Sequence, residues 1–189
     1  MHIVVRVSQG FFTAPIFYGG KLYCENMGQC FLVLSPFPQP AIQWLKMEKK
    51  QLRFTAFLEF LVESDGEILA VVAITGQMQH TRIKEFQVFK ADLSKNTWVP
   101  VKSLDDRVLV VSEDCSVCLS AAEVGGRRNV IYFSLPSPSI ASDEWCCSMW
   151  EQFDLETGRM IDKAHPKTAI KDKRFQKNTT YLMMPNLEP

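Results

Sequence analysis

The sequence predicts an all-β domain in which antiparallel sheets are stacked face to face. Turn-forming Gly, Asn and Asp residues interrupt the 189-residue chain at short intervals, and these residue types tolerate the positive φ that tight hairpins need. Between the turns lie runs of β-branched and aromatic residues, such as ILAVVAI at 68–74 and NVIYFSL at 129–135. This alternation is typical of strands joined by hairpins.

Several of these strands are apolar at both odd and even positions, as at 69–74 and 108–111. A strand that is apolar on both faces is covered on both faces, and a turn as short as Asp65-Gly66 leaves no room for a helical crossover. A β-propeller covers its sheets by stacking one blade on the next, so we predict a partial β-propeller of about three four-stranded antiparallel blades. We expect this domain to span residues 1–162, followed by a polar, basic C-terminal tail at 163–189.

Each predicted strand begins after one turn signal and ends at the next. In chain order the strand candidates are IFY at 16–18, KLYC at 21–24, CFLVL at 30–34, ILAVVAI at 68–74, EFQVFKA at 85–91, RVLVV at 107–111 and NVIYFSL at 129–135. The segment 41–62 is ambiguous, because the spacing of Trp44, Leu45 and Met47 also allows a short helix at its start. Gly125-Gly126 is interpreted as a turn ahead of the last strand.

A weak internal repeat supports the propeller. Ala91-Asp92-Leu93 is followed by Trp98 six residues after the Asp, and Phe153-Asp154-Leu155 is followed by Met160 at the same spacing. The two copies are 62 residues apart. We interpret each copy as an outer hairpin whose bulky residue packs onto the neighbouring blade. Trp98 is therefore expected to pack between blades rather than to stack on a ligand.

Longer stretches resemble the plant F-box-associated β-propeller family with the KIB-type domain. They are FYGGKLYCENMGQCFLVL at 17–34, LVESDGEILAVV at 61–72, FQVFKADLSKNTWVPVKSLDDRVLVVSEDCSVCLSA at 86–121, NVIYFSL at 129–135 and FDLETGRM at 153–160. The resemblance implies a kelch-like propeller that holds the target protein of an SCF-type ubiquitin ligase. In that family a helical F-box often precedes the propeller and docks a Skp-type adaptor. Residues 1–14 contain no F-box, so we expect the chain to begin inside the propeller and a Skp-type adaptor to bind only if an F-box lies outside this chain.

The predicted function is a non-enzymatic protein–protein interaction module, with no catalytic residue, cofactor or metal site. Propellers carry their recognition loops on a rigid scaffold, and the polar loop TGQMQHTR at 75–82 joins two strong strands. The predicted partner-binding residues are Gln77, Met78, Gln79, His80, Arg82, Arg127 and Arg128. An open blade face of about 400 Å² would also favour self-association or instability of the isolated chain.

Motifs for other chemistry are incomplete. Cys115 and Cys118 differ in parity and would point to opposite faces of a strand, so they cannot share a metal ion. No Gly-x-Ser-x-Gly elbow supports a hydrolase, and the Asp105-Asp106 and Glu113-Asp114 pairs are interpreted as solvated hairpin ends.

Charge leaves one alternative function open, a nucleic-acid-binding protein that acts through the basic segment 163–177. The 21 basic and 21 acidic side chains of the whole chain cancel, and Phe175 is the only aromatic residue in that segment that could stack on a base. Nucleic acid is therefore the less favoured partner. The most apolar run, 68–74, is too short to span a bilayer, and the start of the chain does not resemble a secretory signal. We expect an intracellular protein of the cytoplasm, the nucleus or both, without a membrane partner.

Overall fold

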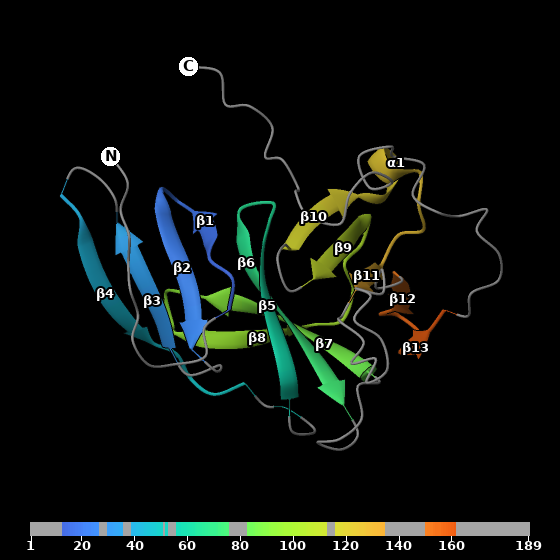
Figure 1. Ribbon diagram of the computed structural model, residues 1–189, viewed down its shortest axis with the longest axis horizontal. Helices are drawn as coiled ribbons and strands as arrows, with labels where there is room; N and C mark the ends of the chain where they lie inside the picture. The colour runs from blue at the N-terminus through green and yellow to red at the C-terminus, as the bar shows by residue number, and fades with distance from the viewer. Residues whose placement is uncertain are drawn as a thin grey trace, which may run out of the picture. The chain divides into compact units, whose positions relative to one another are not determined.

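The computed structural model describes residues 13–26, 30–35, 39–50, 52, 56–75, 83–112, 116–134 and 150–161. Almost all regular structure in these residues is β-strand, arranged in three sheets (Figure 1). No helix among them is long and apolar enough to cross a membrane. The predicted all-β fold of a partial β-propeller is thus confirmed. The described residues fall into two compact units, one up to Ile74 with Gln87–Val101, the other made of Thr75–Phe86 and the residues from Lys102 onward.

The first sheet is an antiparallel meander of four strands in the order β1-β2-β3-β4. Its strands are β1 (Ile16–Tyr18), β2 (Lys21–Asn26), β3 (Cys30–Ser35) and β4 (Ala41–Lys46). The Gly19-Gly20 turn has φ values of +55° and +76°, which is why glycine joins β1 to β2. The ambiguous start of segment 41–62 is therefore strand β4, paired with β3 from Cys30↔Lys46 to Ser35↔Ala41.

The second sheet is another four-stranded antiparallel meander, in the order β5-β6-β7-β8. Its strands are β5 (Ala56–Ser64), β6 (Glu67–Thr75), β7 (Ile83–Asp92) and β8 (Thr97–Val101). Asp65 and Gly66 both have positive φ, 49° and 74°, as a two-residue type I′ hairpin turn requires. The predicted turn and the predicted strand at 68–74 are confirmed.

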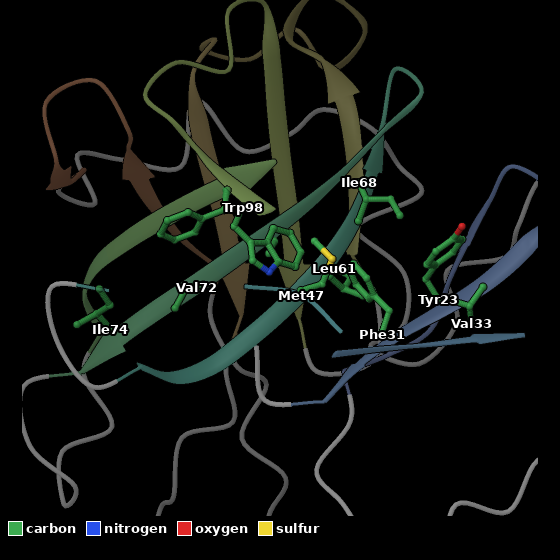
Figure 2. Close-up of a cluster of buried hydrophobic side chains, with 11 residues drawn as sticks. Tyr23, Phe31, Val33, Met47, Leu61, Ile68, Val72, Ile74 and Trp98 are labelled. Carbon is green, nitrogen blue, oxygen red and sulfur yellow. The ribbon is translucent and has the colours of Figure 1, made fainter. Parts of the chain in front are cut away.

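The first compact unit has its core between these two sheets (Figure 2). The core side chains are Tyr23, Phe31, Val33, Met47, Leu61, Ile68, Ala70, Val72, Ile74, Phe89 and Trp98. Aromatic rings link the two sheets, since the ring centroids of Phe31 and Trp98 lie 5.4 Å apart. The interpretation of Trp98 as a packing residue between sheets is therefore confirmed.

The third sheet departs from the four-stranded antiparallel pattern. It contains β9 (Arg107–Ser112), β10 (Ser116–Ser120), β11 (Val130–Ser134), β12 (Glu151–Asp154) and β13 (Arg159–Met160), in the order β10-β9-β11-β12-β13. β11 runs parallel to β9, whereas the sequence predicted antiparallel neighbours. The cause is a short helix, α1 (Ala121–Val124), which the sequence did not predict. It carries the chain from the end of β10 across to the start of β11.

The second compact unit has apolar side chains on both faces of this sheet. On one face, the two buried α1 residues Ala121 and Val124 pack against Val108, Val110, Val130 and Tyr132. On the other, the Phe86 ring lies 4.9 Å from that of Phe133 and 5.4 Å from that of Phe153, measured between centroids. Residues 108–111 are apolar at both odd and even positions because both faces of the sheet are packed in this way.

Candidate functional site

The predicted contact residues Gln77, Met78, Gln79, His80 and Arg82 lie outside the described residues, so their role stays a prediction. Arg127 and Arg128 are described, and both are exposed. They lie in the 125–129 loop, which connects α1 to β11. The 125–129 loop therefore carries the predicted contact residues that the structure describes.

The 125–129 loop is held at its first end by the caps of α1. Ser120 and Glu123 form a capping box at the helix start, and Gly125 ends the helix in the left-handed region at φ +59°. A Cβ at Gly126 would lie 3.1 Å from the Tyr132 hydroxyl oxygen. Glycine at this position lets the chain pass close over Tyr132 and brings Arg127 to the surface beyond it.

Asn129 holds the other end of the loop. Its side-chain oxygen accepts a hydrogen bond from the backbone N–H of Leu104 at 2.8 Å. Its own N–H donates to the carbonyl of Arg107, and its carbonyl accepts from the N–H of Leu155. Asn129 is buried and has a φ of 62°, a conformation that asparagine tolerates better than most residues. Three hydrogen bonds to two other chain segments, the 104–107 turn and Leu155, thus fix the loop end two residues after Arg127.

Arg127 is paired with a buried carboxylate on the third sheet. One guanidinium nitrogen, Nη2, donates to Oδ2 of Asp154 at the end of β12. The other carboxylate oxygen, Oδ1, accepts from the backbone N–H groups of Glu156 and Thr157, each at 3.0 Å. The Asp154 side chain is 5% exposed, whereas the Arg127 side chain is 60% exposed. The ion pair therefore has a buried, fixed acid and a cation that still faces solvent.

The repeated hairpin shows that this turn does not need a distant arginine. Oδ1 of Asp92 accepts from the N–H groups of Ser94 and Lys95, each at 3.1 Å, in the pattern seen at Asp154. Hydrogen bonds from the side chains of Ser94 and Lys95 lower the Asp92 pKa to about 2. Its second oxygen pairs with neighbouring Lys95, at 3.2 Å, and with no distant cation among the described residues. The predicted repeat is confirmed as a shared turn, and the contact from Arg127 is an addition to it.

A surface hollow of about 460 Å³ opens beside this ion pair, and we call it the Arg127 hollow. It is lined by Arg127, Asp154, Thr157, Arg159, Met160 and Ile161. Arg159 lies directly opposite Asp154 in the β12–β13 register and is exposed. Met160 is half-buried, and Ile161 packs on the core beneath α1. The hollow combines two guanidinium groups with an apolar wall, an arrangement suited to binding an anionic group.

The second candidate is a buried cluster of charges in the first compact unit. Lys50 Nζ pairs with Oε1 of Glu25 on β2 and with Oε1 of Glu59 on β5, and it lies 3.6 Å from the centroid of the Trp98 ring. Burial and, to a smaller extent, the Glu59 carboxylate raise the pKa of Glu25 against the opposing effect of Lys50, to about 8 in all. The side chains of Lys50 and Glu25 are 2% and 0% exposed. A partner cannot reach them, so this cluster is part of the core.

A third feature is the outer face of the first sheet, opposite the core. Directly paired residues share a face, and the register aligns Phe17, Leu22, Leu34 and Ile42 across all four strands. Phe17 and Ile42 are each 59% exposed. An exposed apolar face of this kind agrees with the expectation of self-association, which stays a prediction.

Only part of these sites is apparent from the sequence. Arg127 is a predicted contact residue and Asp154 a repeat residue, but nothing in the sequence indicates that the two meet. Thr157 and Arg159 were not predicted as lining residues, although both lie between Asp154 and Met160 in the predicted hairpin. The Lys50 cluster has no sequence signal, because its charged residues are 25 and 9 positions apart along the chain.

No group of His, Cys, Asp and Glu within the described ranges could hold a metal ion. Cys118 is half-buried and forms no disulfide with another described residue, while Cys115 lies outside the described residues, as does the basic segment 163–177.

The comparisons with known proteins agree with the architecture. No significant match was found among the curated proteins or among the solved structures. The profile of the KIB1-4 β-propeller family matches residues 2–165, which is most of the 189-residue chain and includes all three described sheets. The chain belongs to the KIB1-4 β-propeller family.

Proposed function

We propose that this chain is a non-enzymatic protein-interaction domain. Membership of a β-propeller family supports the proposal, because such families generally act as interaction scaffolds. The observation that carries it is the position of Arg127, which a buried carboxylate holds at the edge of a hollow. The matching turn at Asp92 forms without an ion pair to a distant described cation. The turn at Asp154 therefore does not need Arg127 in order to fold, and the ion pair can serve recognition instead.

The chemistry of the hollow also favours binding over catalysis. Thr157 supplies the only hydroxyl group among the lining side chains, and Asp154 supplies the only carboxylate. Asp154 already accepts hydrogen bonds from Arg127 and from two backbone N–H groups. It is therefore not available as the general base that would activate the threonine.

The finer proposal concerns the biological role. We propose that the domain recognises the target protein of a plant SCF-type ubiquitin ligase, working in the cytoplasm or the nucleus. The resemblance of residues 15–162 to the plant F-box-associated family supports this role. In this proposal a Skp-type adaptor binds only to a form of the protein that carries an F-box.

Affinity capture with quantitative mass spectrometry tests the proposal. The full chain is compared with Arg127→Ala, and Lys102→Ala is the control because Lys102 is an exposed cation that neither lines the hollow nor belongs to the predicted contact residues. We expect a protein that is captured by the wild type and by Lys102→Ala, but is depleted by about tenfold with Arg127→Ala, as for the loss of a charged hydrogen bond. Equal recovery with all three chains would rule out the hollow as the binding surface.

A further inference from the structure

We propose that the Arg127 hollow binds a carboxylate side chain, a glutamate or aspartate flanked by aliphatic residues, presented by a partner protein. The inference rests on the proposed function and specifies the chemistry that the hollow recognises. Three features of the hollow support it: the donors of Arg127 that pair with no other described residue, the neutralised charge of Asp154 and the apolar wall.

Donors remain available on Arg127 after it has paired with Asp154. A guanidinium group carries five N–H donors in a fixed plane, and Asp154 takes the hydrogen bond from Nη2. The side chain is 60% exposed, so part of the guanidinium faces solvent. Because the buried acid already fixes the orientation of Arg127, less side-chain entropy is lost when a second acid binds.

Asp154 does not repel an incoming anion strongly, because its charge is compensated. Both of its oxygens accept hydrogen bonds, one of them from a cation. Among the lining side chains Arg127 and Arg159 are positively charged and Asp154 is negatively charged, so the lining has a net charge of +1. Glu156 is an exposed member of the same turn but does not line the hollow. One carboxylate therefore balances the charge of the lining.

The rest of the lining selects a peptide over a nucleic acid. Met160 and Ile161 form an apolar wall beside the two arginines, which suits an aliphatic side chain next to the bound acid. Single-stranded nucleic acids are typically bound through aromatic side chains on which bases stack, and the lining has no aromatic residue. A doubly charged phosphate would leave one negative charge uncompensated against a lining of +1. The hollow thus fits an unmodified acidic peptide segment best.

Peptide titration tests this inference directly. The probe is a capped pentapeptide with a central glutamate between two leucines, and its analogues carry glutamine or phosphoserine at the centre. Binding to the full chain is measured by NMR chemical-shift perturbation at low salt. We expect a dissociation constant of about 1 mM for the glutamate peptide, as for a small contact, and binding that is about tenfold weaker for the glutamine peptide.

Variants locate the binding and separate the two proposals. Arg159→Ala should weaken binding of the glutamate peptide by about five- to tenfold, while Lys102→Ala, at an exposed cation outside the hollow, should leave its binding unchanged. Retained chemical-shift dispersion shows that each variant is folded. Equal binding of the glutamate and glutamine peptides, stronger binding of the phosphoserine peptide, or no binding of any peptide at about 10 mM would overturn the inference. If capture of a protein partner still depended on Arg127 in that case, the proposed function would stand and only the preference for an acid would fall.

Discussion

The buried carboxylate of Glu25 should make the stability of this protein fall as the pH rises through neutrality. Glu25 faces Lys50, Glu59 and Cys30, and burial raises its pKa from 4.5 to about 8. A group whose pKa is higher in the folded state stabilises the fold fully below the unfolded pKa, and this contribution is lost as the pH rises through the folded pKa. The substitution Glu25→Gln removes the ionisation and keeps the shape of the side chain.

The magnitude follows from the two pKa values. They differ by about 3.5 (8 − 4.5), and each pH unit corresponds to about 1.4 kcal/mol, so the complete loss is about 5 kcal/mol. Between pH 5.5 and pH 7.5, where most of the titration lies, the wild type should lose about 2–3 kcal/mol of unfolding free energy through this group. Glu25→Gln should not show this component. The unfolding free energy of the variant relative to the wild type should therefore rise with pH.

Urea denaturation at a series of pH values, followed by tryptophan fluorescence, measures this difference. Glu48→Gln is the matched control, because Glu48 is exposed in the segment that leads to Lys50. Its stability curve should run parallel to that of the wild type. If the Glu25→Gln curve also ran parallel to the wild type over the same pH range, Glu25 would not be the titrating group and the reasoning would be wrong.

Three further outcomes are expected. Trp98→Ala should lower the unfolding free energy by about 3–5 kcal/mol, because it leaves a cavity in the core between two sheets. Met160 occupies the matching position in the second hairpin but is only half-buried, so Met160→Ala should lower the unfolding free energy by less than about 2 kcal/mol. Asn129→Ala should cost about 1–3 kcal/mol in urea melts, because the buried N–H of Leu104 loses its acceptor. Ile42→Lys should reduce self-association in sedimentation velocity at rising concentration, because it places a charge on the exposed apolar face.

Each of these outcomes has its contrary result. Equal effects at Trp98 and Met160 would mean that the two hairpins are buried alike. An Asn129→Ala variant as stable as the wild type would show that the Leu104 amide is hydrated. A wild-type sedimentation coefficient that does not change with concentration would contradict self-association through the outer face of the first sheet.

The local parts of the fold could be predicted from sequence. Asp65-Gly66 and Gly19-Gly20 adopt the positive φ values that their residue types favour, so the hairpins follow from short-range chemistry. The repeat around Asp92 and Asp154 also follows from local hydrogen bonds within one turn. Strand apolarity on both faces, as at 108–111, correctly indicated packing on both sides of the sheet.

The non-local parts could not be predicted in this way. Trp44 and Leu45 read equally well as strand or helix, and only pairing with β3 selects the strand. Helix α1 is four residues long, too short for a periodic pattern, and with it the parallel pairing of β11 was missed. Arg127 and Asp154 are 27 positions apart, so their contact depends on how α1 and the 125–129 loop place the arginine. The site emerges only from the three-dimensional arrangement.

The parallel pairing of β11 with β9 bears on the order in which this chain folds. In the first two sheets most neighbouring strands are joined by short turns, so pairing can spread from one hairpin to the next. Each residue of β11 pairs with a β9 residue 22 positions earlier in the chain, as in Val130↔Val108. Closing a loop of this length costs more chain entropy than closing a tight turn. The β9–β11 junction should therefore be a late and rate-limiting step of folding, and the Arg127 hollow, whose β12 wall is attached to β11, should take shape only after it.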